Sequence, residues 1–136
     1  QGISWTEFTL TGQSNHAGTT PMRMRHDAGY AAAAIASFVR KLANDIGGNQ
    51  VATVGALNLS PNLVNVVAEQ AVMTVDLRNT DEAQLQEAER RLVLEALRAC
   101  GWVQKEAARR LGLSSRALNY RIRKLGITNP HWRQNR

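Results

Sequence analysis

Three side chains near the C-terminal end of the chain have the types and the spacing to recognise DNA bases. Arg116, Asn119 and Arg123 follow each other at intervals of three and four residues, so on a helix they share one face. Arg can pair through two hydrogen bonds with guanine, and Asn can pair in the same way with adenine. The sequence therefore predicts a helix whose face enters a major groove and contacts bases of double-stranded DNA.

Further basic side chains surround these three residues. Residues 1–89 hold 5 Lys and Arg against 9 Asp and Glu, whereas residues 90–136 hold 12 against 2. This positive excess points to a polyanionic partner for the second segment. Phosphate contacts supply affinity without sequence preference, and we expect them from Arg109, Arg110, Tyr120, Arg121 and Lys124. The alternative interpretation is a pair of solvated basic helices.

Two short helices joined at Gly112 would position these residues. Ala108 stands four residues before this glycine, and Leu118 stands six residues after it. A small Ala lets two helices approach closely, Gly tolerates a left-handed turn, and the apolar residues bury the inner face. We therefore expect helices over residues 105–111 and 115–125.

Residues 92–127 resemble the Fis-type helix-turn-helix domain that closes many bacterial enhancer-binding transcriptional activators. The resemblance is carried by the runs GWVQKEAARRLGL and LNYRIRKLGI. In that family the domain binds DNA as a dimer, and a helix before the motif contributes to the pairing. The resemblance implies sequence-specific DNA binding and transcription regulation by a homodimer.

The first two thirds of the chain have a different character. Alternating polar and apolar positions and β-branched residues predict three strands, over residues 3–13, 51–59 and 66–77. Asp27 is a suitable N-cap for an alanine-rich helix over residues 28–45, which the two glycines after residue 46 end. A second helix, with its cap at Thr80-Asp81, continues from residue 82 to residue 100.

The element order strand, helix, strand, strand, helix predicts an α+β fold. It suits a small antiparallel sheet with two helices on one face, the ferredoxin-like arrangement, whose last strand should follow the second helix. No strand pattern follows that helix in this sequence. We therefore expect a ferredoxin-like domain without its last strand over residues 1–89, and an all-α helix-turn-helix domain over residues 90–136. The first strand would then have an open edge.

The run GQSNHAGTTPM over residues 12–22 resembles the lid or dimerisation domain of the N-carbamoyl-amino-acid and allantoate amidohydrolases, which are dinuclear-metal enzymes. Residues 25–28, 62–67 and 75–78 also fit that family, so the resemblance covers residues 1–89. In that family the domain is inserted in a catalytic domain, pairs with its copy in a second subunit and reaches over the partner's metal site.

This resemblance implies roles for three residues. His16 would stabilise the developing oxyanion, Asn65 would hold the substrate amide, and Arg78 would clamp the substrate carboxylate. Taken alone, the three would be a solvated loop residue, a turn residue and a charge at a strand end. In the family the catalytic domain supplies the metal ligands, and His16, His26 and His131 have no spacing suited to zinc. We expect no metal, no cofactor and no hydrolysis by the isolated chain.

Composition sets the remaining expectations. The single cysteine, Cys100, excludes an intrachain disulfide. The longest apolar stretch, residues 31–39, is shorter than the ~20 residues that a membrane-spanning helix needs. We expect a cytoplasmic protein without a membrane partner, and its start at Gln1 suggests a fragment or a fusion.

Two functions follow from these patterns. The main one is a DNA-binding regulator in which the lid-like domain serves dimerisation. The alternative is a catalytically incomplete fragment of an amidohydrolase, a hydrolase of C–N bonds, that contributes substrate-binding residues in trans.

Overall fold

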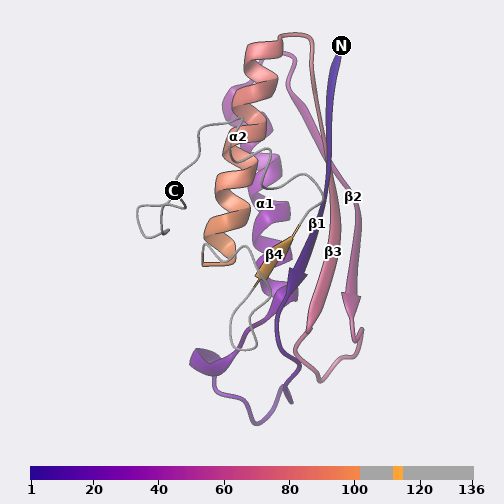
Figure 1. The fold of residues 1–136 in the computed structure, drawn as a ribbon, viewed down its shortest axis with the longest axis vertical. Coiled ribbons are helices and arrows are strands. Elements are labelled where there is room, and N and C mark those ends of the chain that lie inside the picture. The colour runs from indigo at the N-terminus through magenta and orange to yellow at the C-terminus, as the bar shows by residue number, and fades with distance from the viewer. Residues whose placement is uncertain (102–111, 115–136) are drawn as a thin grey trace, which may run out of the picture.

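The computed structural model of the protein describes residues 1–101 and 112–114. They form an antiparallel sheet with two helices on one of its faces, as Figure 1 shows, which confirms an α+β fold. The strands and helices are β1 (Gly2–Thr11), α1 (Ala28–Ile46), β2 (Val51–Ser60), β3 (Gln70–Asn79), α2 (Glu82–Ala99) and β4 (Gly112–Ser114), with a short 3-10 helix, η1 (Met22–Met24), before α1.

The predicted helix caps are confirmed. The Asp27 carboxylate accepts a hydrogen bond of 3.1 Å from the backbone N–H of Tyr30, and Asp81 accepts one of the same length from Gln84. Each bond satisfies an amide that a helix start leaves without an intrahelical partner. Gly47, with φ at +68°, ends α1. Local rules therefore fix both ends of α1 and the start of α2.

The third strand begins later than the sequence predicts. We expected a strand over residues 66–77, whereas β3 runs from Gln70 to Asn79. The reason lies in the backbone pairing just before it. Val67 N–H donates to the carbonyl of Asn15, and Glu69 N–H donates to the carbonyl of Ser60. This segment therefore bonds to the loop after β1 and to the last residue of β2, although its apolar residues resemble a strand.

The core lies between the helices and the inner face of the sheet. Strand β1 contributes Phe8 and Leu10, which are fully buried. Helix α2 carries apolar side chains at helical spacing, and they join the same cluster at Leu85, Ala88, Leu92, Val93, Ala96 and Leu97. The domain boundary that the sequence predicts between residues 89 and 90 falls inside α2. The core packing continues through this helix to Cys100.

The prediction that no strand follows the second helix is wrong. The sheet order is β2-β3-β1-β4, and β4 pairs antiparallel with β1 over Thr9–Thr11. Gly112, which we expected in a turn between helices, is the first residue of this strand. The edge of β1 offers backbone N–H and C=O groups to any extended segment, and side-chain patterns do not reveal such pairing. The helices expected over residues 105–111 and 115–125 lie outside the described residues.

Within the part of the chain that the structure describes, no helix is both long enough and apolar enough to cross a membrane.

We predict that Leu97→Ala lowers the free energy of unfolding of the sheet by about 2–5 kcal/mol, because the change leaves a cavity in the shared core. Urea unfolding followed through the amide NMR signals of β3 measures this loss. The matched control is Gln86→Ala on the exposed side of α2, which should change the free energy by less than about 0.5 kcal/mol. Unchanged unfolding of β3 in Leu97→Ala would show that the end of α2 does not belong to the core of the sheet.

Candidate functional site

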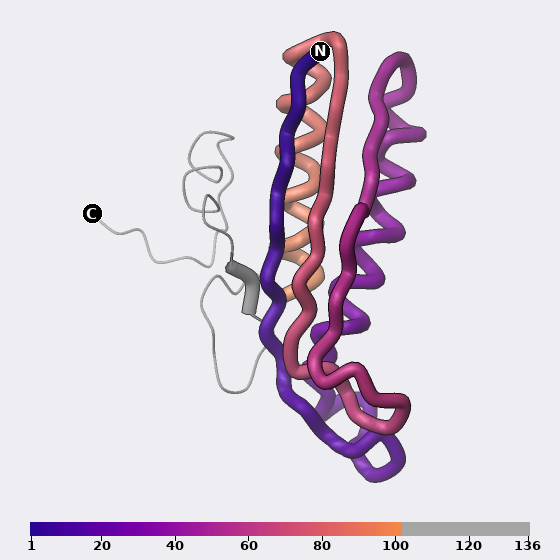
Figure 2. The backbone as a smooth tube through the Cα atoms, turned by 90° about the vertical axis from the view of Figure 1, so that its right-hand side faces the viewer, coloured from indigo at the N-terminus to yellow at the C-terminus, as the bar shows by residue number. Residues whose placement is uncertain are grey.

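Two loops meet at the end of the sheet where β1 stops. The segment after β1 and the segment before β3 lie together at the lower end of the molecule in Figures 1 and 2. Backbone hydrogen bonds join them: Gly12 N–H donates to Glu69 at 2.7 Å, and Ala17 N–H donates to Asn65 at 2.9 Å. His16 and Val66 form an antiparallel bridge between these two bonds. The loop that carries His16 therefore continues the ladder between β1 and β3.

Gly12 stands where this loop leaves the sheet. A Cβ atom there would lie 2.1 Å from the backbone oxygen of His26, far inside van der Waals contact. Next to it, Gln13 N–H donates to the same oxygen at 2.8 Å. Only a residue without a side chain lets the two backbones approach this closely. The start of the His16 loop is thereby held against the segment that precedes α1.

The imidazole of His16 has one nitrogen bonded within its own loop. The backbone N–H of Gly18 donates to Nδ1 at 3.0 Å, so Nδ1 carries no proton in this arrangement. In a neutral imidazole the proton then lies on Nε2, which can donate a hydrogen bond. The residue is exposed. His16 can thus act as a hydrogen-bond donor toward a molecule bound at this end of the sheet.

Arg25 holds the backbone around His16. Its Nη2 donates to the carbonyl of Ala17 at 2.7 Å, and its Nε donates to the carbonyl of Thr20 at 3.1 Å. Thr20 in turn bonds to the His16 carbonyl through its own N–H, at 3.2 Å, and through its hydroxyl, at 2.8 Å. The turn after His16 is therefore fixed from two sides.

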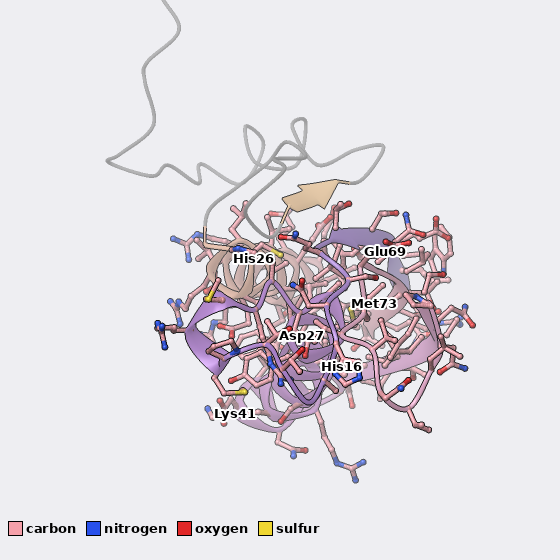
Figure 3. All side chains as sticks on the ribbon, turned by 90° about the horizontal axis from the view of Figure 1, so that it is seen from below. His16, His26, Asp27, Lys41, Glu69 and Met73 are labelled. Atoms are coloured by element: carbon pink, nitrogen blue, oxygen red, sulfur yellow. The ribbon has the colours of Figure 1, made fainter. Side chains whose placement is uncertain are left out.

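The structure brings Asn65 and His16 to the same end of the molecule. Asn65 is exposed, and its backbone carbonyl accepts the bond from Ala17, the residue after His16. Figure 3 views the molecule from this end and labels His16, with His26 and Asp27 of the same region. Two of the three residues expected to serve a substrate therefore lie on adjoining loops.

Arg78 lies at the opposite end of the sheet. It pairs with Ile3 near the start of β1, whereas the His16 loop follows the end of that strand. Strand β1 has 10 residues, so at about 3.4 Å per residue its two ends are roughly 30 Å apart. One copy of the chain does not bring Arg78 to His16 and Asn65.

The Arg78 guanidinium is oriented by Asp76, two residues earlier on the same face of β3. Its Nε and Nη2 donate to the two carboxylate oxygens at 3.0 and 3.1 Å. The hydrogen bond from Arg78, with help from its charge, lowers the pKa of Asp76 against an opposing effect of burial. The same bond and the carboxylate charge raise the pKa of Arg78. Asp76 occupies the edge of the guanidinium that carries Nε and one N–H of Nη2. The opposite edge, which carries the N–H groups of Nη1, can still donate to a carboxylate.

The described residues offer neither a metal site nor a reactive thiol. Among residues 1–101 and 112–114, no group of three His, Cys, Asp or Glu side chains could hold a metal ion. The two metal ions that the resemblance to the amidohydrolases implies would therefore need ligands from outside these residues. Burial raises the pKa of the Cys100 thiol to about 12, which disfavours the thiolate that a nucleophilic cysteine needs. The eight residues expected to contact DNA are outside the described ranges.

Sequence reasoning missed three residues of this arrangement. Gly18 lies in the run over residues 12–22 and Arg25 in the segment 25–28, both of which resemble the amidohydrolase lid, and Asp76 stands two residues before Arg78. None of the three was given a role. One signal was available for Asp76, because residues two apart on a strand share a face. The contacts of Gly18 and Arg25 depend on how the loop folds back, which no regular spacing reveals.

Comparison with known proteins places residues 1–101 in the family described as the peptidase dimerisation domain. The N-carbamoyl-L-amino-acid amidohydrolase of Rhizobium meliloti is 43% identical over 100 residues, which are 74% of this chain and 24% of that protein. The allantoate amidohydrolase of Escherichia coli strain K12 is 44% identical over 79 residues, 58% of this chain and 19% of that protein.

Solved structures agree with these relatives. The crystal structure of an amidase of the hydantoinase/carbamoylase family from Burkholderia multivorans superimposes with a TM-score of 0.74 at 33% identity. The match covers 83% of this chain and 26% of that one. The chain thus spans about a quarter or less of the length of the relatives it matches.

The prediction that the chain functions as a DNA-binding regulator is wrong. Amidohydrolases match most of its length, whereas the bacterial regulatory protein family of Fis type matches residues 84–125 only. Residues 84–99 of that match belong to α2. The apolar face of α2 is buried against α1 and the sheet, so this helix serves the core of the N-terminal fold. The findings support the alternative, an amidohydrolase fragment.

Three observations agree. The run over residues 12–22 resembles the amidohydrolase lid, the described residues have the fold of an amidase of that kind, and the family model matches residues 1–101. The chain belongs to the peptidase dimerisation domain family.

Proposed function

We propose that this chain is the lid and dimerisation part of an amidohydrolase that cleaves C–N bonds of small ureido acids, such as N-carbamoyl amino acids. The observation that carries the proposal is the His16 loop, in which the Gly18 N–H leaves Nε2 as the donor. The proposal is also supported by sequence similarity to relatives named for that activity and by a fold shared with an amidase of the hydantoinase/carbamoylase family. The metal ligands of the catalytic centre would be residues other than those that the structure describes.

In this proposal His16 donates a hydrogen bond to the oxygen that becomes negative when the carbonyl is attacked. A neutral imidazole with its proton on Nε2 can do this without transferring the proton. Donors that are already oriented toward a developing charge lower the barrier because they need no reorganisation during the reaction. Asn65, on the adjoining loop, would hold the substrate amide through its side chain.

Arg78 would bind the substrate carboxylate through the side of the fork that Asp76 leaves open. Asp76 fixes the plane of the guanidinium, so less side-chain freedom is lost when the substrate binds. A carboxylate that does not react contributes mainly to binding of the ground state. Loss of Arg78 should therefore raise KM more than it lowers kcat.

The distance between the two ends of β1 implies that His16 and Arg78 of one copy serve different catalytic centres. A ureido acid is much shorter than the roughly 30 Å that a strand of ten residues spans. A dimer with two-fold symmetry would solve this problem, because it can place the His16 end of one copy near the Arg78 end of the other. We infer a homodimer of ferredoxin-like lids that build two shared sites.

We predict that residues 1–101, grafted in place of the matching segment of the Rhizobium meliloti enzyme, give an active N-carbamoyl amino acid hydrolase. In this graft His16→Ala should lower kcat about 100-fold to 1,000-fold, as expected for the loss of one oxyanion donor. Arg78→Ala should raise KM for the same substrate. Steady-state kinetics measure both effects.

The matched control for Arg78→Ala is Arg98→Ala, an exposed arginine on α2, which should leave kcat and KM unchanged. Arg78→Lys tests the fork, because a single ammonium cannot replace two parallel N–H bonds. An active graft whose kcat is insensitive to His16→Ala would contradict the proposed role of His16.

We further predict that mixing the His16→Ala and Arg78→Ala grafts restores activity at a substrate concentration far below the raised KM of Arg78→Ala, where each variant alone is slow. In a heterodimer with shared sites, one site has lost both residues and the other retains both. Random exchange of subunits should then return about a quarter of the wild-type rate, because half of the two-fold dimers are mixed and each has one intact site. The rate is measured after the two variants have been unfolded and refolded together.

The control for the mixing experiment refolds each variant alone by the same procedure. If the mixture shows only the average of the two separate rates, His16 and Arg78 of one copy act in the same site and the shared-site arrangement is excluded.

A further inference from the structure

The surroundings of the His16 imidazole are more specific than a donor on a solvated loop requires. The Gly18 N–H points at Nδ1 from 3.0 Å. A Cβ atom on residue 18 would lie 3.1 Å from Cε1 and 3.3 Å from Nδ1 of the ring. These separations are tighter than ordinary van der Waals contact. The backbone of residue 18 thus lies against the ring edge, and any side chain there would force the ring to tilt.

The position of the Gly18 N–H depends in turn on Arg25. Residues 17 and 20 flank the turn after His16, and the Arg25 guanidinium binds the backbone carbonyl of each. The side chain of Arg25 is partly buried. A charge-assisted hydrogen bond from a planar guanidinium to a carbonyl is stronger than a neutral one and fixes direction as well as distance. Arg25 therefore ties the two ends of the turn that presents the Gly18 amide.

The remaining hydrogen bonds of this turn also hold the backbone on both sides of His16. The His16 carbonyl accepts bonds from the N–H and the hydroxyl of Thr20, so it is directed into the turn. The N–H of Ala17 is used by Asn65 on the other loop. With the backbone on both sides of His16 engaged, the ring orientation is set by the Gly18 amide.

We propose that Gly18 and Arg25 are positioning residues that hold His16 as the Nε2–H tautomer in a single ring orientation. The inference rests on the proposed function, because it explains how this lid would present one fixed donor to a reacting carbonyl. Gly18 acts directly on the ring through its N–H. Arg25 acts on Gly18 through the two carbonyls, and it touches neither the ring nor the substrate.

The test is long-range nitrogen–proton NMR of the imidazoles in the full 136-residue chain, in mildly alkaline solution. In the wild type, His16 should show the Nε2–H tautomer alone, with a coupling across the hydrogen bond between the Gly18 amide proton and Nδ1. In Arg25→Gln, His16 should give the averaged signals of both tautomers, as a free imidazole does, and the coupling should be lost. Gly18→Ala should weaken the coupling because the ring is displaced.

Two references keep the result specific. Arg23→Gln is the matched control, because Arg23 is an exposed arginine of the short helix η1 in the same loop, and its spectrum should equal that of the wild type. His26 is the internal reference, and its tautomer should not change in any variant. The amide signals of β1 and β3 report whether each variant is folded. Should Arg25→Gln be unfolded, Arg25→Lys replaces it, because one ammonium cannot bind both carbonyls in the same geometry.

The outcomes separate this inference from the proposed function. Folded Arg25→Gln and Gly18→Ala variants that keep one tautomer and the full coupling would overturn the inference, even if the grafted enzyme is active. His16 signals averaged over both tautomers, with loss of the coupling, would support the inference, even if the graft is inactive. In an active graft, Arg25→Gln should lower kcat about 100-fold with little change in KM, since misplacing a catalytic group by about 1 Å has an effect of that size.

Discussion

The register between β1 and β3 is the constraint on which the rest of the structure depends. The two strands pair over all 10 residues of β1, from Gly2 opposite Asn79 to Thr11 opposite Gln70. Burial of Phe8 and Leu10 on the helical side fixes this register, because a slip by one residue would turn both toward solvent. The same register places Arg78 on the outer face at one end of the sheet. It also decides where the chain leaves β1 to form the His16 loop.

The hydrogen-bond ladder between β1 and β3 continues beyond the strand ends into the loop that carries His16. The backbone of this surface loop is therefore held by the same kind of pairing as the strands. Backbone bonds continue from residue 12 to residue 17 on one side and from residue 69 to residue 65 on the other. Loops that carry function on a rigid scaffold are common, but here part of the scaffold extends into the loop itself. Main-chain pairing therefore places the backbone of the two loops that carry His16 and Asn65, and the contacts of Arg25 and Gly18 act in addition on the turn and on the ring of His16.

Much of this fold could be predicted from sequence because caps and buried helix faces follow local rules. Asp27 and Asp81 begin their helices as expected, and alternation predicted a strand where β1 lies. The apolar stripe of α2 was visible as well, but periodicity does not tell which partner covers it. A helix that pairs DNA-binding domains and a helix that covers a sheet have the same pattern. The Fis-type match and the lid match therefore overlap on α2, and the packing of α2 against α1 and the sheet shows that this helix belongs to the core of the N-terminal fold.

The site was less predictable than the fold because its parts depend on directions that spacing does not encode. His16, Asn65 and Arg78 stand out by residue type, but the sequence does not reveal that a whole strand length separates the first two from the third. A sheet of this kind is stiff along its strands, so the separation is not closed by loop motion. A substrate that needs both an oxyanion donor and a carboxylate clamp must then receive them from two copies. Dimerisation would in that case be part of the chemistry, since each lid would complete the site of its partner.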